Sequence, residues 1–203
     1  MTLALSQAPL NRQLRAATHE AHVRLNRHPL LNLITRPSLD IPTYTMILQL
    51  YCQFYQAAEA LIRDALANGL ADFDYSHRYK ATWLAQDLEY FERSSGLNGN
   101  QPDPVELVAP RNQAELVGIM YPLEGSTLGG QVISKHLLRN LGITRNTGGR
   151  FFNGYGKETP QFWEEFQRFA CHAVSCPDEQ DRACDYARYL FEQLEAYLDA
   201  HVS

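Results

Sequence analysis

The 203-residue chain has few lysines and no long apolar run, and each of these features argues against one class of protein. Only three of its 18 basic residues are lysines, and the formal net charge is −5. Nucleic-acid binding needs clustered basic side chains, so we expect no nucleic-acid partner. No apolar stretch approaches the roughly 18 residues of a membrane span, so we expect no membrane segment. The N-terminus lacks the basic and apolar regions of a signal peptide, which predicts a soluble, cytoplasmic protein.

Cysteine occurs four times, but without the spacing of a metal site. No two cysteines form a C-x-x-C pair. Cys171 beside His172 is the one combination that suggests a pair of metal ligands. Free thiols in a reducing compartment explain the cysteines better.

The pattern typical of strands, alternation of apolar and polar residues, is hard to find, whereas a 3.6-residue period recurs throughout. Turn signals such as Asn68-Gly69 and Ser94-Ser95-Gly96 separate the periodic segments. We predict helices at about 11–27, 43–67, 74–93, 111–140, 159–175 and 178–201. No linker is long enough to divide domains. We therefore expect one all-α domain over residues 1–203, with residues 1–10 as a flexible N-terminal segment.

The most informative segment reads YPLEGSTLGGQVI, over residues 121–133. It places Gly125, Gly129 and Gly130 inside a helical pattern, at a cost on the order of 2–3 kcal/mol relative to alanine. Gly125 and Gly129 are four residues apart, so on a helix they share one face that carries no side chain. Such a face leaves room for a flat ligand. Close packing of two helices is the alternative explanation.

The first predicted helix carries a histidine at the edge of its apolar face. The residues of that face are Leu14, Thr18, Ala21 and Leu25. His22 lies about 80° from Leu14, whereas His19 lies at about 140°. A neutral imidazole is a common metal ligand, and a single histidine suffices to hold a haem iron. A histidine at the core edge, hydrogen-bonded to a carbonyl, is the alternative for His22.

Two motifs resemble those of haem oxygenases. The pattern L-x-x-A-T-x-x-x-H over residues 14–22 resembles the N-terminal motif of that family, in which the last histidine is the proximal haem ligand. Residues 123–132, LEGSTLGGQV, resemble the distal-helix motif, in which the glycine backbone lies against the haem face and bound oxygen. The segment 150–156, followed by Trp163 and Phe166, extends the resemblance. Among family branches, the chain is most similar to bacterial members, including those that supply biliverdin to bacteriophytochromes.

The resemblance implies a helical bundle that holds haem b between a proximal helix and a kinked distal helix. It implies oxidative cleavage of haem to biliverdin, ferrous iron and carbon monoxide, with molecular oxygen as co-substrate. Electrons then come from a separate ferredoxin or reductase, and a bacteriophytochrome is a candidate acceptor of biliverdin. The implied iron ligand is His22. The other haem-binding residues that it implies are Arg15, Gly125, Gly129 and Gly130. The implied catalytic residues are Gly125, Ser126 and Gly129.

Two positions depart from the family pattern. Many members carry an aspartate directly after the first distal glycine, where this chain has Ser126. A hydroxyl can hold a water molecule, but it carries no charge. The glutamate often found four residues after the proximal histidine is Asn26 here. Two further hypotheses therefore stay open: a haem-binding or haem-sensing protein without turnover, and a helical interaction module without a cofactor.

Overall fold

Short helix-forming signals along the chain produce an all-α structure. The computed structural model describes residues 9–96 and 102–202, and these ranges contain no strand, as the periodicity predicts. The helical elements are α2 (Pro9–Arg27), α3 (Pro29–Asn32), η1 (Leu33–Thr35), α4 (Ile41–Ala67), α5 (Ala81–Ser95), α6 (Gln113–Leu141), α7 (Arg150–Asn153), η2 (Gly156–Glu158), α8 (Thr159–Ala173) and α9 (Pro177–Asp199). No helix within the described ranges is long and apolar enough to cross a membrane.

Side-chain caps set the ends of the long helices. Asp40 begins α4 by accepting a hydrogen bond from the Thr43 amide (2.9 Å). Asn112 begins α6 in the same way through the Glu115 amide (3.0 Å). Gly142 ends α6 in a left-handed conformation with φ of 68°. Helices α2, α4, α6, α8 and α9 begin and end within two residues of their predicted bounds, and for α4 and α6 these local signals account for the agreement.

The predicted start of the third long helix, near residue 74, is wrong, because α5 begins at Ala81. The carboxylate of Glu59, on α4, accepts hydrogen bonds from the main-chain amides of Lys80 (2.5 Å) and Ala81 (3.1 Å). A side chain from another helix therefore caps α5. At the N-terminus, Pro9 already belongs to α2. Residues 1–8, where we expect a flexible segment, lie outside the described residues.

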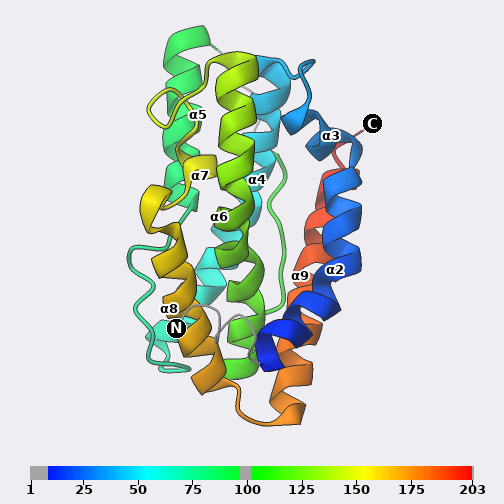
Figure 1. Ribbon diagram of the computed structural model, residues 1–203, viewed down its shortest axis with the longest axis vertical. Coiled ribbons are helices and arrows are strands. Elements are labelled where there is room, and N and C mark those ends of the chain that lie inside the picture. Colours follow the sequence, from blue (N-terminus) through cyan, green and yellow to red (C-terminus); the bar gives the residue numbers. More distant parts are fainter. Residues whose placement is uncertain (1–8, 97–101, 203) are drawn as a thin grey trace.

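Helix α6 runs through the centre of the bundle (Figure 1). It packs against α9, α8, α7 and α4, while α2 lies alongside α9 and α4 lies alongside α5. Its helical conformation continues from Gln113 to Leu141, through Pro122 and all three glycines of the motif. Helix α6 therefore contains, at these three glycines, a stretch of backbone without side chains.

Candidate functional site

Helix α2 buries one face and leaves His22 at its edge. Leu14 is fully buried, and the Thr18 hydroxyl donates to the Leu14 carbonyl (2.7 Å). Ala21 and Leu25 continue the buried face, which packs mainly against α9. His22 lies outside this face and is exposed, whereas the helical angles favour it as an inward-pointing imidazole. The helix thus holds the imidazole on a rigid element while leaving the ring accessible.

The surroundings of His22 favour a neutral imidazole. The edge of its ring meets the Phe191 ring of α9, with centroids 5.8 Å apart. The carboxamide nitrogen of Asn26 lies 3.4 Å from His22 Nδ1. Partial burial lowers the pKa of His22, and the neighbouring His19 lowers it further. A neutral imidazole, with one ring nitrogen free of its proton, is the form that coordinates a metal ion.

Packing explains some of the α6 glycines and leaves others unexplained. A Cβ atom on Gly118 would lie 2.7 Å from the Ala183 carbonyl oxygen, and one on Gly130 would lie 2.5 Å from the Phe152 carbonyl oxygen. These glycines therefore let α6 approach α9 and α7. A Cβ on Gly125 would make only an ordinary contact with Trp163 (3.8 Å), and one on Gly129 would meet no described atom within 4 Å. Protein packing thus gives no reason for glycine at 125 or 129.

The open part of α6 is apolar. Leu128 is 42% exposed and Val132 is 57% exposed. With Gly129 between them, they lie within about one turn of the helix on the same side as Gly125. Apolar side chains and a bare backbone thus form a surface suited to a flat, apolar ligand.

Tyr121 connects this part of α6 to α2. Burial raises the pKa of Tyr121, while a hydrogen bond with Thr18 and the charge of Arg15 lower it. Both partners belong to the N-terminal motif on α2. The Tyr121 ring also lies 5.8 Å from the Trp163 ring of α8. The structure therefore brings Thr18 and Tyr121 together, although they are more than 100 positions apart in the chain.

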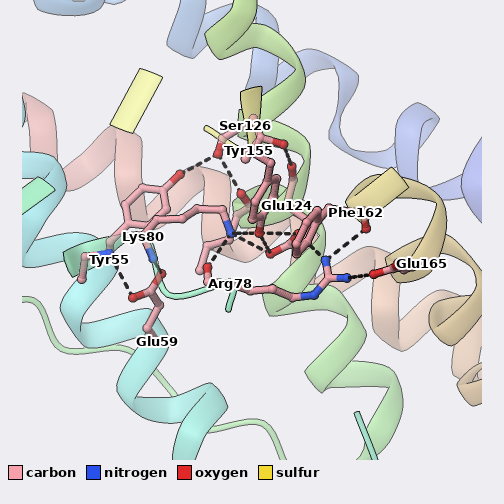
Figure 2. Close-up of polar contacts among 12 residues, drawn as sticks. Tyr55, Glu59, Arg78, Lys80, Glu124, Ser126, Tyr155, Phe162 and Glu165 are labelled. Atoms are coloured by element: carbon pink, nitrogen blue, oxygen red, sulfur yellow. Dashed lines mark hydrogen bonds and ion pairs between the residues drawn. The ribbon is translucent and has the colours of Figure 1, made fainter. Parts of the chain in front are cut away.

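Ser126 is held by two hydrogen bonds (Figure 2). The Tyr55 hydroxyl of α4 donates to Ser126 Oγ (3.0 Å), and Ser126 Oγ donates to the Leu123 carbonyl (2.7 Å). Burial raises the pKa of Tyr55, so its hydroxyl stays protonated and acts as a donor. Sequence reasoning missed Tyr55, because its partner lies 71 residues away.

Sequence reasoning also missed a buried ionic cluster beside Ser126. Glu124 accepts hydrogen bonds from Lys80 Nζ (2.6 Å) and from Arg78 Nη1 (2.8 Å). The Tyr155 hydroxyl also donates a hydrogen bond to Glu124 Oε2 (3.0 Å). The only sequence signal is one carboxylate inside the apolar stretch of residues 116–128.

Two arginines belong to the segments that carry the family resemblance. Arg15 is exposed on α2. Arg150 donates to the Gly154 carbonyl, and its guanidinium lies 4.1 Å from the centre of the Trp83 ring. In the described part of the chain, no group of three or more His, Cys, Asp or Glu residues gathers to hold a metal ion.

Comparisons with known proteins bear on the family and the fold of the chain. A family model described as heme oxygenase matches residues 8–199. A heme oxygenase structure from Leptospira interrogans has a TM-score of 0.78 at 17% identity, over 94% of this chain and 98% of that one. The NO- and CO-bound heme oxygenase from Neisseria meningitidis has a TM-score of 0.73 at 21% identity, over 94% of this chain and 90% of that one.

A third structure, heme oxygenase-1 from the cyanobacterium Synechocystis in complex with heme, has a TM-score of 0.68 at 16% identity, over 95% of this chain and 92% of that one. At these identities the structural likeness establishes the fold. No curated protein sequence matches the chain.

Proposed function

Because this chain belongs to the haem oxygenase family, we propose that it cleaves haem to biliverdin, ferrous iron and carbon monoxide. Molecular oxygen is the co-substrate, and a ferredoxin or reductase supplies electrons. The observation that carries the proposal is the unexplained pair Gly125 and Gly129. Each costs roughly 0.5–1 kcal/mol in a helix, and no protein contact requires either one. A ligand that lies against their backbone accounts for both.

The residues present fit haem b. His22 offers an accessible, neutral imidazole as the proximal ligand. Leu128, Gly129 and Val132 offer an apolar wall for the porphyrin ring. Arg15, an exposed side chain of α2 whose charge acts on Tyr121, offers a charge for a propionate. Gly130 stays a predicted haem contact from the motif, but its contact with α7 already accounts for its lack of a side chain.

Ligation through Nε2 of His22 sets a requirement for Asn26. The proton of the neutral imidazole must then sit on Nδ1, which becomes a donor. The structure places the amide nitrogen of Asn26 toward Nδ1, and a half-turn of the carboxamide would bring its oxygen there as the acceptor that this requirement needs. In that orientation Asn26 fixes the ring through a neutral hydrogen bond.

The bound haem supplies oxygen activation, and the chain supplies the surroundings in which protons move. Ser126 and Tyr55 form a pair of hydroxyl groups at the glycine segment. Ser126 can rotate its hydroxyl hydrogen away from the Leu123 carbonyl and donate a hydrogen bond to a water molecule on the haem side, while its oxygen still accepts a hydrogen bond from Tyr55. Water held by Ser126 extends this path.

A second candidate function is haem binding or sensing without turnover. The hydrogen-bonded state of Ser126 favours it, because its proton is directed to a carbonyl and it carries no charge. Glu124, the adjacent carboxylate, is held by Lys80 and Arg78 and does not replace the missing acid.

A hemin titration separates these functions. Purified protein should develop a histidine-ligated Soret band, and ascorbate or a reductase in air should convert it to a biliverdin band. A stable Soret band would support the binding protein, and no Soret band would contradict both. His22→Ala should change the haem spectrum, whereas His172→Ala, at an exposed position on α8, should not. An unchanged spectrum in His22→Ala would overturn the ligand assignment.

We further propose that the protein acts in the cytoplasm and passes biliverdin to a bacteriophytochrome. This proposal rests on the sequence resemblance. Co-expression with a bacteriophytochrome apoprotein tests it, since the photoreceptor should acquire its red-absorbing chromophore only when this enzyme is present.

A further inference from the structure

Glu124 lies at the centre of a fully buried ionic cluster, directly before Gly125 (Figure 2). Its side chain is 1% exposed. One carboxylate oxygen is 2.6 Å from Lys80 Nζ, and the other is 2.8 Å from Arg78 Nη1. Each charge therefore has an opposite charge at hydrogen-bond distance.

The two cations are held from several elements. Lys80 Nζ also donates to the Arg78 carbonyl (2.9 Å) and to the Tyr155 hydroxyl (3.1 Å), which uses all three of its protons. Arg78 donates to the Phe162 carbonyl (3.0 Å) and to Glu165 (3.0 Å), both on α8. The cluster therefore joins α6 to α8, to Tyr155, which precedes η2, and to the segment before α5.

Stability alone is a weak reason for such a cluster. Replacing a buried set of ion pairs with apolar residues of similar volume is often neutral or stabilising. What the cluster offers in addition is directional contact, because each hydrogen bond holds Glu124 at one distance and angle.

Helix α6 needs such a contact at this point. Pro122 removes one main-chain donor from the helix, and the nearby glycines have no side chains to pack. The close contacts of Gly118 with α9 and of Gly130 with α7 fix the helix on either side of this stretch. Glu124 lies between these two contacts.

Successive residues of an α-helix point about 100° apart. Glu124, Gly125 and Ser126 therefore face three different directions. Glu124 meets the ionic cluster, Gly125 faces Trp163, and Ser126 meets Tyr55. Rotation of α6 that relaxes one of these contacts disturbs the others.

We propose that Glu124 is a positioning residue that sets the rotation of α6 and thereby the placement of Gly125 and Ser126 relative to the haem. The link to haem rests on the proposed function, whereas the effect of Glu124 on α6 does not. Glu124 touches neither haem nor the reacting atoms, and it acts through its neighbours.

Glu124→Gln tests this role, because it keeps the side-chain shape but removes the charge that Lys80 and Arg78 require. In the haem-free protein, hydrogen exchange at the amides of residues 119–130 should become at least about tenfold faster. In the hemin complex, the pH at which the visible spectrum changes from its acid to its alkaline form should move upward, because a misplaced Ser126 donates less to the distal side. Glu124→Asp keeps the charge with a shorter reach and should restore part of both properties.

Glu115→Gln is the matched control, since Glu115 is also a buried, ion-paired carboxylate on α6 but lies two and a half turns away. It should leave the exchange of residues 119–130 and the spectral midpoint unchanged. If Glu124→Gln does not fold, Tyr155→Phe removes one donor from Glu124 and should give the same changes at smaller size. Wild-type exchange and an unshifted midpoint in these variants would overturn the proposal. A wild-type chain without a Soret band would contradict the proposed function, while the exchange measurement would still test Glu124.

Discussion

At the scale of single residues, the α6 glycines serve two purposes that the sequence pattern does not separate. Gly118 and Gly130 allow other elements to approach the helix backbone, whereas Gly125 has Trp163 only at ordinary contact distance and Gly129 faces open space. The motif reveals that a bare helix face exists. Only the positions of the neighbouring elements decide which glycine faces protein and which faces open space.

Gly129→Ala and Gly130→Ala should therefore change stability in opposite directions. Alanine at 129 should raise the free energy of unfolding by about 0.5–1 kcal/mol, because it adds a better helix former without a clash. Alanine at 130 should lower it by about 1–3 kcal/mol, because its Cβ overlaps the Phe152 carbonyl. Urea unfolding of the haem-free proteins measures both. A loss of stability in Gly129→Ala would show that this face is already occupied.

The same Gly129→Ala variant should be a poorer enzyme. A methyl group on this face takes space that we assign to haem and oxygen, and overpacking of about 1.4 kcal/mol corresponds to a tenfold effect. We expect biliverdin formation to slow by about that factor. Leu138→Ala, an exposed position further along α6, serves as the control and should retain wild-type turnover. A fully active Gly129→Ala would remove Gly129 from the site.

Tyr55→Phe tests the hydroxyl pair. It removes the donor to Ser126 without changing the ring contacts, and the free energy of unfolding should fall by about 1 kcal/mol. Hemin should still bind, since Tyr55 is not a ligand, but biliverdin formation should slow. Absorption spectra before and after addition of ascorbate measure both properties. Unchanged turnover would exclude Tyr55 from the proton path.

At the scale of helices, local chemistry determined what was predictable. The bounds of α4 and α6 follow from caps three residues away in sequence, and the buried face of α2 follows from the helical period. The start of α5 was missed because its cap, Glu59, comes from 21 residues away. The Glu124 cluster was missed for the same reason. Lys80 is 44 residues from its partner Glu124, and Glu165 is 87 residues from its partner Arg78. Contacts of this length appear only once the chain is folded.

The contribution of Asp87, on α5, to the stability of the fold depends on pH. Its carboxylate accepts hydrogen bonds from the amides of Arg150 (2.7 Å) and Phe151 (2.8 Å), at the start of α7. Burial raises its pKa from 3.8 to about 6, against the opposing effect of these amides. The folded state therefore binds the proton more tightly than the unfolded state. The resulting stability is fully present below about pH 4 and is lost as the pH rises through about 6.

The free energy of unfolding of the wild type minus that of Asp87→Asn should therefore decrease by up to about 3 kcal/mol between about pH 4 and pH 7. Urea unfolding across this range measures the difference. Asp40→Asn is the opposite control, because the hydrogen bonds from Thr43 lower the pKa of Asp40. The free energy of unfolding of the wild type minus that of Asp40→Asn should decrease as the pH falls. A difference for Asp87→Asn that does not vary with pH would contradict the raised pKa.

At the scale of the whole molecule, the candidate site joins two parts of the bundle. Helix α2, which carries His22, packs mainly on α9, whereas α6 also packs on α4, α7 and α8 (Figure 1). Tyr121, through Thr18 and Arg15, connects α6 to α2 near the N-terminal half of α2. A haem held by His22 and by the α6 wall adds a second connection, further along both helices.

This arrangement predicts which helices haem protects. At hemin concentrations near 100 times Kd, binding contributes about 2.7 kcal/mol, which corresponds to roughly hundredfold slower exchange for openings that break the site. We expect that protection at the amides of α2 around His22 and of α6 around Gly129. Helix α5 lies on the other side of the bundle, so amides there that exchange by local opening should be protected much less (Figure 1). In His22→Ala the protection of α2 should fall sharply, because the covalent link to that helix is lost. Equal protection of α2 and α5 by hemin would mean that haem binds elsewhere or stabilises the bundle only as a whole.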